Sequence, residues 1–290
     1  MDQLTVAAHA KINLSLDIVS RLPDGYHAMR MVMLGTTLAD DVTLRRSADG
    51  RIQARSDLRY LPCDERNVAV KAAKLFFAEL GMEGEGLMIE MKKRIPVCAG
   101  LGGGSSDAAA VLRGLNRMYS AGLSREKLET LALHVGADVP FCVRGGTALA
   151  EGKGEKLTDL APMPDCHIVI CKPGFSISTP ALFSRIRCEK IRNRPDTAGM
   201  IDALARSDLQ GVACRCFNVF EGVLERPQAE VGVIKTRMLD GGALGTAMTG
   251  SGSAVFGIFD DAAAAVRTHE ALRGDYRDCF LAAPCGQEEI

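Results

Sequence analysis

A run of glycines and serines near the middle of the chain has the composition and spacing of a phosphate-binding loop. It extends from Pro96 to Asp107 and reads PVCAGLGGGSSD. Glycine permits positive φ and close approach of the backbone, so several N–H groups of such a loop can point at one anion. The apolar pattern that follows predicts a helix, whose free N–H groups and dipole add positive charge at the same place. The stretch therefore predicts a phosphate site, with a glycine loop that binds nothing as the alternative.

Two common nucleotide-binding loops do not match this stretch. A Walker A loop needs Lys and then Ser or Thr after its last glycine, and no lysine occurs between Lys93 and Lys127. The dinucleotide fingerprint G-x-G-x-x-G also fails, because its last glycine position, counted from Gly100, is Ser105. Neither a P-loop enzyme nor a Rossmann enzyme is expected.

A second group of polar residues lies on a predicted strand near the N-terminus. Lys11 and Asn13 alternate with apolar residues, so they are expected to share one face of that strand, two residues apart. The apolar residues are expected to share the opposite face: Ile12, Leu14, Leu16 and Ile18. A lysine that simply points into solvent from a strand is the alternative for Lys11.

The elements that must position these groups alternate between strands and helices. Strands are expected at 31–34, 42–44, 87–91, 147–150, 167–171 and 279–282, with a hairpin over 246–256. Asn67 and Ser124 are expected to cap helices, Asp107 to lie in the first turn of the helix after the glycine loop, and further helices to cover 229–239 and 262–272. The glycine, proline and charge content of 152–164 suggests a linker, which divides the chain into domains 1–160 and 161–290. The pattern is typical of an α+β protein.

Bulk composition narrows the function classes. With 290 residues, 47% hydrophobic and 24% charged, the chain has the composition of a globular protein, and its net charge of −1 gives no electrostatic case for nucleic acid or an anionic membrane. No apolar run is long enough to span a bilayer and no signal peptide is recognisable, so a cytoplasmic protein is expected. The ten cysteines lack any C-x-x-C pair and are expected to be free thiols, and the five scattered histidines argue against a histidine metal centre.

Three segments in order resemble the GHMP kinase superfamily: AKINL at 10–14, GLGGGSSD at 100–107 and TGSG at 249–252. Within that superfamily the chain is most similar to the branch of 4-diphosphocytidyl-2-C-methyl-D-erythritol kinases, through PDGYH at 23–27, GADVPF at 136–141 and KPGFSIST at 172–179. The resemblance implies a two-domain α+β fold, with an N-terminal domain like ribosomal protein S5 domain 2 and a ferredoxin-like C-terminal domain.

The resemblance also implies a reaction, in which ATP with Mg²⁺ phosphorylates the 2-hydroxyl of a cytidine diphosphate-linked methylerythritol in the non-mevalonate isoprenoid pathway. Asp138 would be the catalytic base and Lys11 the cation that orients it, although an N-cap role is the alternative for Asp138. The implied ATP contacts are Pro96, Gly100, Leu101, Gly102, Gly103, Gly104, Ser105, Ser106 and Asn67, with Gly250, Ser251 and Gly252 of the third motif nearby. Asn67 has its N-cap role as alternative, and Ser106 is a candidate Mg²⁺ ligand.

Substrate contacts follow from the same resemblance. Tyr26 and His27 would hold the cytosine from one side and Phe183 from the other, with core packing as the alternative for Phe183. Asn13 and Thr179 would supply polar contacts to the small-molecule substrate. The chain departs from the family pattern at His9, Leu34 and Ser253. A homoserine or mevalonate type of kinase, or a nucleotide sensor without catalytic activity, are the other functions considered.

Overall fold

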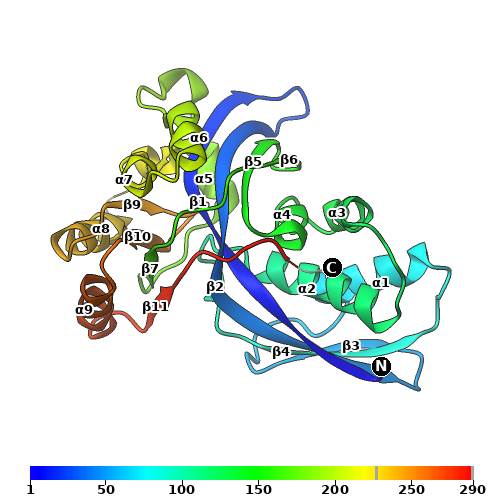
Figure 1. The fold of residues 1–290 in the computed structure, drawn as a ribbon. Helices are drawn as coiled ribbons and strands as arrows, with labels where there is room; N and C mark the ends of the chain where they lie inside the picture. The colour runs from blue at the N-terminus through cyan, green and yellow to red at the C-terminus, as the bar shows by residue number, and fades with distance from the viewer. Residues whose placement is uncertain (226–227, 289–290) are drawn as a thin grey trace.

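The computed structural model describes residues 1–225 and 228–288, and the chain forms two β-sheets covered by helices (Figure 1). The first sheet contains β1 (Gln3–Arg21), β2 (His27–Ser47), β3 (Ile52–Ser56), β4 (Gly86–Lys92), β5 (Thr147–Gly152), β6 (Lys156–Asp159) and β8 (Phe217–Asn218). The second sheet contains β7 (His167–Lys172), β9 (Gly245–Met248), β10 (Val255–Phe259) and β11 (Asp278–Ala282). The helices are α1 (Val68–Glu79), α2 (Gly103–Met118), α3 (Arg125–Leu133), α4 (Val139–Arg144), α5 (Thr179–Arg185), α6 (Thr197–Ala205), α7 (Leu209–Ala213), α8 (Glu230–Asp240) and α9 (Ala262–Arg273).

The two sheets confirm the predicted α+β class. The first has the order β3-β4-β2-β1-β8, with β5 paired to β2 and β6 paired to β5. The second has the order β11-β7-β10-β9 and includes the predicted hairpin, β9–β10. In Figure 1, α1 to α4 lie beside the first sheet, whereas α8 and α9 lie on the second. The short strands β3, β6 and β8 and the helices α5 to α7 were not predicted.

The two long antiparallel strands β1 and β2 form the centre of the first sheet, and β1 corrects one prediction. The four apolar residues of its alternating segment do not share one face, because the pairing with β2 shifts register between Asn13 and Ser15. Ile12 and Leu14 therefore join one apolar cluster, and Leu16 and Ile18 join the other. A β-bulge of this kind leaves no apolar signature, because the alternation continues through it.

A further correction concerns β2. The predicted separate strands at 31–34 and 42–44 are parts of this one strand, which runs for 21 residues without a break. A polar stretch between two apolar runs resembles a turn in the sequence. Here it remains extended because β1 pairs with Gly35 and again from Ala39 onward, and between them Thr37 N donates to Ala283 O, just after β11, at 2.9 Å.

The predicted helix caps are largely confirmed. The Asn67 side chain accepts a hydrogen bond from Ala69 N at 2.9 Å, and Ser124 accepts one from Lys127 N at 3.3 Å. Asp107, however, does not lie in the first turn of α2, which begins at Gly103. The helix starts earlier than predicted because the glycines themselves form its first turn, and Asp107 is consequently buried in its second.

The segment predicted as a linker contains a strand, since β6 pairs with β5 of the first sheet. Two segments from the second half of the chain also contact the first half. β8 pairs with β1 in parallel, and the tail after β11 returns to the first sheet through bridges from Thr36 to Pro284 and from Gly145 to Gln287. Figure 1 shows this tail crossing from the second sheet toward α2. The division at residue 160 stays a prediction.

All ten cysteines lie in the described part of the chain and are free thiols, as predicted. Four of them are buried in the apolar clusters, where cysteine packs as a small apolar residue: Cys142, Cys166, Cys171 and Cys279. Among the residues described, no helix has both the length and the apolar character needed to cross a membrane.

Candidate active site

Two glycine motifs that lie 150 residues apart in the chain are in direct contact. A Cβ added to Gly100 would lie 2.1 Å from the carbonyl oxygen of Thr249, and one added to Gly250 would lie 2.8 Å from the carbonyl oxygen of Gly100. Both glycines have positive φ, of 79° and 54°. Ala254 N also donates to Ala99 O at 3.0 Å. The glycines are therefore required where the backbones of the two sheets meet.

Lys11 is fixed between these motifs and a carboxylate. Its backbone N–H donates to Leu101 O at 3.0 Å, and its Nζ donates to Asn13 Oδ1 at 2.7 Å. The same Nζ lies 3.6 Å from Asp138 Oδ2, and the Lys11 side chain is only 4% exposed. The predicted strand lysine is thus a buried cation, and the alternative of a solvated lysine is wrong.

Asp138 precedes α4 but does not cap it. Its side chain makes no capping hydrogen bond, and its φ and ψ of −83° and −13° already lie in the helical region. The carboxylate is 39% exposed, so one side faces Lys11 and the other is open to a cavity. Pro140 in the first turn of the helix lacks an N–H, which reduces the need for a capping side chain. The capping alternative for Asp138 is therefore wrong.

A buried polar network fixes the third motif against β1. The Thr249 hydroxyl accepts a hydrogen bond from Asn13 N at 3.0 Å and lies 3.3 Å from Gly100 O, to which it donates. The Asn218 amide donates to Met248 O at 2.7 Å and to Gly250 O at 2.9 Å. Asn218 was not singled out in the sequence, and Thr249 was named only as the first residue of the third motif, without a role of its own, because a threonine or an asparagine beside a turn is too common to carry a signal.

Three adjoining cavities share lining residues, and the smallest of the three contains Lys11 and Asp138. A cavity of about 680 Å³ is lined by the glycine loop and by Asn67. A cavity of about 350 Å³ contains Lys11 and Asp138 and shares Gly100, Gly102, Ser105 and Ser251 with the first. The third, of about 1310 Å³, shares Met29, Lys153 and Phe183 with the small one. Thr179 lines all three, and its hydroxyl lies 2.7 Å from that of Ser251. The Lys11–Asp138 pair therefore lies at the junction of two larger spaces.

The first cavity has the form expected of a phosphate site. Its wall includes nearly all the residues predicted to contact ATP: Pro96, Gly100, Leu101, Gly102, Gly103, Gly104, Ser105, Asn67, Ser251 and Gly252. Gly102 has a φ of 72° and directly precedes α2, so the free N–H groups of the first helical turn border this space.

Ser106 differs from its neighbour Ser105. Its hydroxyl donates to His9 O at 2.7 Å, and its N–H donates to Gly102 O at 2.8 Å. It is 1% exposed and does not line the cavity, which corrects its place as a candidate ligand of ATP or Mg²⁺. The cause is the α-helical period, which turns successive side chains by about 100° and leaves only Ser105 toward the cavity. Asn67 lines the cavity, but its amide is used by the helix cap and by Pro62 O.

A buried ion cluster behind the glycine loop was not predicted. Lys93 Nζ contacts the carboxylates of both Asp40 and Asp107, and all three side chains are at most 5% exposed. Asp40 also accepts a hydrogen bond from Ile95 N at 2.8 Å, so the cluster ties the entry of the loop to α2. Burial raises the pKa of Asp107 to about 7, against the attraction of Lys93. One oxygen of Asp107 has no hydrogen-bond partner among the described residues.

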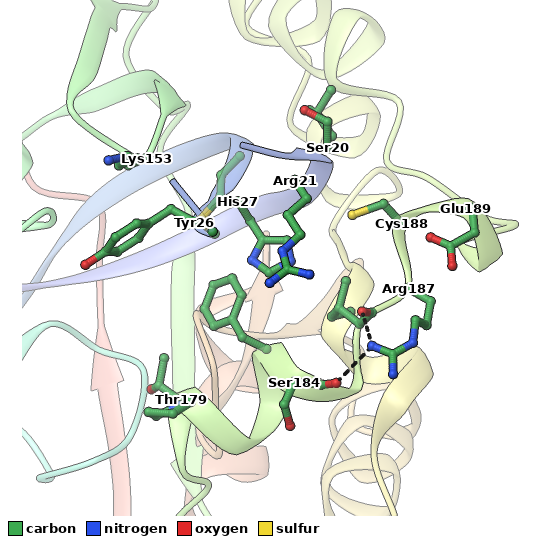
Figure 2. A pocket seen from close by; sticks show the side chains of 16 residues that line it. Ser20, Arg21, Tyr26, His27, Lys153, Thr179, Ser184, Arg187, Cys188 and Glu189 are labelled. Carbon is green, nitrogen blue, oxygen red and sulfur yellow. Dashed lines mark hydrogen bonds between the residues drawn. The ribbon is translucent and has the colours of Figure 1, made fainter. Parts of the chain in front are cut away.

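The largest cavity is open and lined by aromatic and cationic side chains (Figure 2). The rings of His27 and Phe183 lie 5.2 Å apart at 33°, which is the separation of two rings in direct contact. A base therefore cannot lie between these two rings as they stand. Tyr26 is 64% exposed, Figure 2 shows it pointing away from His27, and Lys153 Nζ lies 4.4 Å from its ring centre. Burial and the nearby charge of Arg21 lower the pKa of His27.

Phe183 also packs against the interior, since its ring meets that of Phe220 edge-on at 4.9 Å. The core-packing alternative therefore describes one side of this residue, whereas the other side lines the cavities. Lys153, which was not predicted, borders both the largest and the junction cavity and forms an ion pair with Asp24 at 2.6 Å. A lone lysine in a glycine-rich, charged segment gave no signal in the sequence.

Comparisons with known proteins agree with this geometry. Residues 67–146 match the GHMP kinases N terminal domain, and residues 200–278 match the GHMP kinases C terminal domain. A 4-diphosphocytidyl-2-C-methyl-D-erythritol kinase of Brevibacillus brevis is 42% identical over 287 residues, covering 99% of this chain and 98% of that protein. One of Acetivibrio thermocellus is 40% identical over 281 residues, covering 97% and 99%. A crystal structure of 4-(cytidine 5'-diphospho)-2C-methyl-D-erythritol kinase has a TM-score of 0.82 at 35% identity, covering 98% of this chain and 100% of that one.

Proposed function

Because the chain belongs to the family of 4-diphosphocytidyl-2-C-methyl-D-erythritol kinases, we propose that it transfers the γ-phosphate of ATP to the 2-hydroxyl of 4-diphosphocytidyl-2-C-methyl-D-erythritol. The observation that carries the proposal is the junction cavity. In this cavity Lys11 Nζ and Asp138 Oδ2 lie 3.6 Å apart, between the cavity lined by the glycine loop and the large cavity with aromatic lining. A phosphoryl donor and an acceptor that enter from opposite sides would meet at that pair.

Asp138 acts as the general base in this proposal. Its carboxylate is half-exposed toward the junction, where it can accept the proton of the attacking hydroxyl. Lys11 Nζ is held by Asn13 Oδ1 at 2.7 Å, and it orients the carboxylate while offsetting negative charge that grows on the transferred phosphoryl group. Phosphoryl transfer requires positioning and charge stabilisation more than covalent chemistry, which fits a site of rigid, buried polar groups.

The ATP phosphates would lie against the glycine loop and the start of α2, with Gly250, Ser251 and Gly252 closing the far side. An oxygen atom that could bind Mg²⁺ is also available beside this space, because Mg²⁺ prefers oxygen ligands. The Ser105 hydroxyl borders both the phosphate and the junction cavity, and Mg²⁺ commonly uses few protein ligands and completes its shell with water and phosphate oxygens. When bound, the ion would neutralise charge on the phosphates, and we propose Ser105 as the protein group that holds it.

The cytidyl part of the substrate would occupy the largest cavity. Its volume of about 1310 Å³ far exceeds the need of homoserine or mevalonate, and its aromatic lining suits a flat base. Because His27 and Phe183 contact each other, we propose that the base stacks on the open face of Phe183 on the Tyr26 side, with His27 supporting that ring. Asn13 and Thr179 line the junction and would contact the acceptor end.

A coupled assay of ADP release tests the proposal. The enzyme receives ATP and Mg²⁺ with 4-diphosphocytidyl-2-C-methyl-D-erythritol, homoserine or mevalonate, and Asp138→Asn serves as the matched inactive control. Release with the cytidyl compound alone is expected. Release with a rival acceptor would retain the kinase and reject the substrate. No release with any acceptor, while ATP still binds, would favour a nucleotide sensor.

A further inference from the structure

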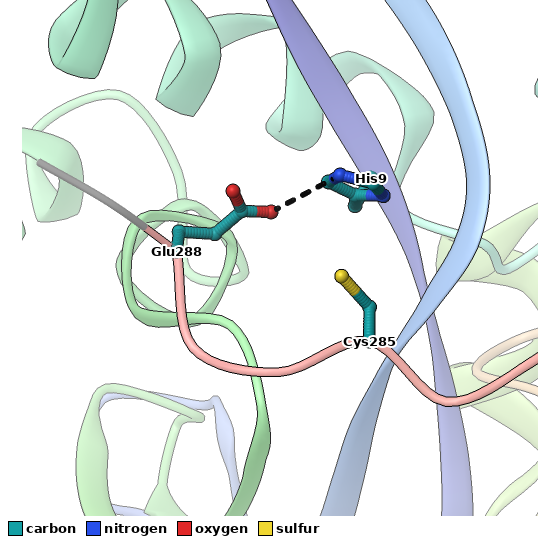
Figure 3. A group of neighbouring side chains, drawn as sticks. All are labelled: His9, Cys285 and Glu288. Atoms are coloured by element: carbon teal, nitrogen blue, oxygen red, sulfur yellow. Dashed lines mark ion pairs between the residues drawn. The ribbon is translucent and has the colours of Figure 1, made fainter.

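Three metal-binding side chains from opposite ends of the chain meet away from the active site (Figure 3). His9 lies on β1, and Cys285 and Glu288 lie on the tail that follows β11. The imidazole, thiol and carboxylate atoms all lie within 4.8 Å of one another, and each residue is half-buried. None of the three lines the cavities assigned to the reaction. The scattered histidines argued against a histidine metal centre, because the two partners of His9 lie more than 270 residues away along the chain.

Among the residues that the structure describes, one ring nitrogen of His9 has no hydrogen-bond partner and could bind a cation. Nδ1 lies 3.0 Å from Thr36 O, and a carbonyl can only accept, so Nδ1 carries a proton. Nε2 then faces Glu288 Oε1 at 3.9 Å, which is too long for a hydrogen bond. A histidine that binds a metal usually donates its other N–H to a carbonyl or carboxylate, as Nδ1 does here.

The other two groups are oriented toward the same point. Glu288 uses its second oxygen, Oε2, to pair with Arg113 at 3.3 Å, which leaves Oε1 directed at His9. Arg113 is fixed in turn, since it is 1% exposed and donates to Ala7 O at 2.9 Å. Cys285 completes the triangle, and its backbone N–H donates to Gly35 O at 2.9 Å. All three candidate ligands are therefore anchored by contacts outside the triangle.

We propose that His9 Nε2, Cys285 Sγ and Glu288 Oε1 bind one zinc ion, with water as the fourth ligand. Nitrogen, thiolate sulfur and carboxylate oxygen are the ligands that zinc takes at about 2.0–2.3 Å, which places tetrahedral ligand atoms about 3.3–3.8 Å apart. The 3.9 Å between Nε2 and Oε1 is about 0.5 Å longer than the roughly 3.3–3.4 Å of a tetrahedral nitrogen–oxygen pair, so these two side chains would move slightly closer on binding. On binding, the Sγ–Zn bond forms and the thiol proton leaves to solvent.

The site would fasten the tail to the centre of the first sheet. The tail already follows β2 and α4, through Ala283 N to Thr37 Oγ1 at 2.9 Å and Glu288 N to Arg144 O at 3.0 Å. We call this tail, residues 283–288, the strap. Zinc would link the strap to His9 on β1, two residues before Lys11. The role is thus structural: zinc would stabilise the strap against fraying without taking part in phosphoryl transfer.

Metal titration of the full, tag-free, metal-free chain tests the site. Zn²⁺ in competition with a chromophoric chelator should bind with one equivalent, and Co²⁺ should give a thiolate-to-cobalt absorption band. Because loss of a supporting residue alone costs 10–100-fold in affinity, Cys285→Ser, His9→Gln and Glu288→Gln should each weaken binding at least about 100-fold. The matched controls Cys63→Ser and His134→Gln, which change exposed residues elsewhere, should bind like the wild type.

A second measurement needs no substitution and uses the wild-type chain. Zinc should slow alkylation of Cys285 in the wild type at least about tenfold, read by peptide mass spectrometry, while labelling of Cys63 stays unchanged. Less than one equivalent of zinc, unchanged affinity in Cys285→Ser, or equal labelling of Cys285 with and without zinc would each overturn the proposal. Kinase activity that persists in Cys285→Ser is expected, because the site is separate from the reaction.

Discussion

The proposed site has two ends that are built in different ways. The reaction end surrounds Lys11 and Asp138, and the base end, named for the cytosine base that it would hold, surrounds Tyr26 and Phe183. At the reaction end, Lys11, Asn13 and Thr249 are almost fully buried, and hydrogen bonds between three distant segments fix each of them. At the base end, Tyr26 is 64% exposed, and its neighbour Lys153 is held by an ion pair on the surface. The residues proposed to act in the reaction are thus held by buried contacts, whereas the residues proposed to recognise the base are exposed or half-buried side chains. Substitutions should separate turnover from affinity along that division.

The largest expected effect is that of Asp138→Asn at the reaction end. The amide keeps the shape of the carboxylate but cannot accept the hydroxyl proton, so kcat should fall about 10²- to 10⁴-fold. Affinities for ATP and for the cytidyl substrate should stay within a few-fold, measured by calorimetry. Asp24→Asn, which removes a carboxylate at the base end, is the matched control. Unchanged turnover in Asp138→Asn would remove the catalytic role of this residue.

Lys11→Met tests whether the two ends differ in their tolerance of substitution. Loss of the cation should lower kcat about 10²- to 10³-fold, as for the loss of one preorganised donor. Asn13 Oδ1 also loses its donor in the interior, so the midpoint of thermal unfolding should fall as well. Lys153→Met removes an exposed lysine at the base end and should leave that midpoint nearly unchanged. Equal shifts in the two variants would contradict the comparison.

Phe183→Ala probes the boundary between the ends. Stacking of a base on an aromatic ring contributes about 1–3 kcal/mol, so KM for the cytidyl substrate should rise about 5- to 160-fold while KM for ATP stays the same. Because the ring also packs on Phe220, Phe183→Leu is the matched variant that retains apolar volume. If Leu restores KM, the residue acts through packing and not through stacking.

The reaction end was largely predictable from sequence, and the reasons are physical. The phosphate loop of this chain contains three consecutive glycines, 102–104, and such a run is visible without knowledge of the fold. Lys11 and Asn13 occupy alternate positions on a strand, so their shared face follows from the period. The contact between Gly100 and Gly250, however, joins two sheets, and only the resemblance to a family brought those motifs together before the structure did.

The remaining features could not be predicted because they depend on contacts between distant residues without a local pattern. Asp40, Lys93 and Asp107 look like surface charges, and only the path of the glycine loop buries them. His9 and Glu288 are brought together by a tail that returns to the first sheet across the whole molecule. The side-chain direction of Ser106 depended on the first residue of α2, and helix boundaries are what sequence patterns locate least well.

The smallest expected effect concerns the support behind the reaction end and is a dependence of stability on pH. Because burial raises the pKa of Asp107 from 3.8 to about 7, the folded chain binds more protons than the unfolded chain between those values, and stability falls as pH rises through that window. Because Lys93 contacts the Asp107 carboxylate and offsets part of this effect, the free energy of unfolding should fall by on the order of 1 kcal/mol between pH 5 and pH 7.5. Asp107→Asn removes this loss, which urea unfolding at the two pH values measures. Asp24→Asn should retain it, because Lys153 lowers the pKa of Asp24 and places its effect in the acidic range, where stability is lost as pH falls. An equal slope in the wild type and Asp107→Asn would mean that the buried cluster is no more sensitive to pH than the exposed ion pair at the base end.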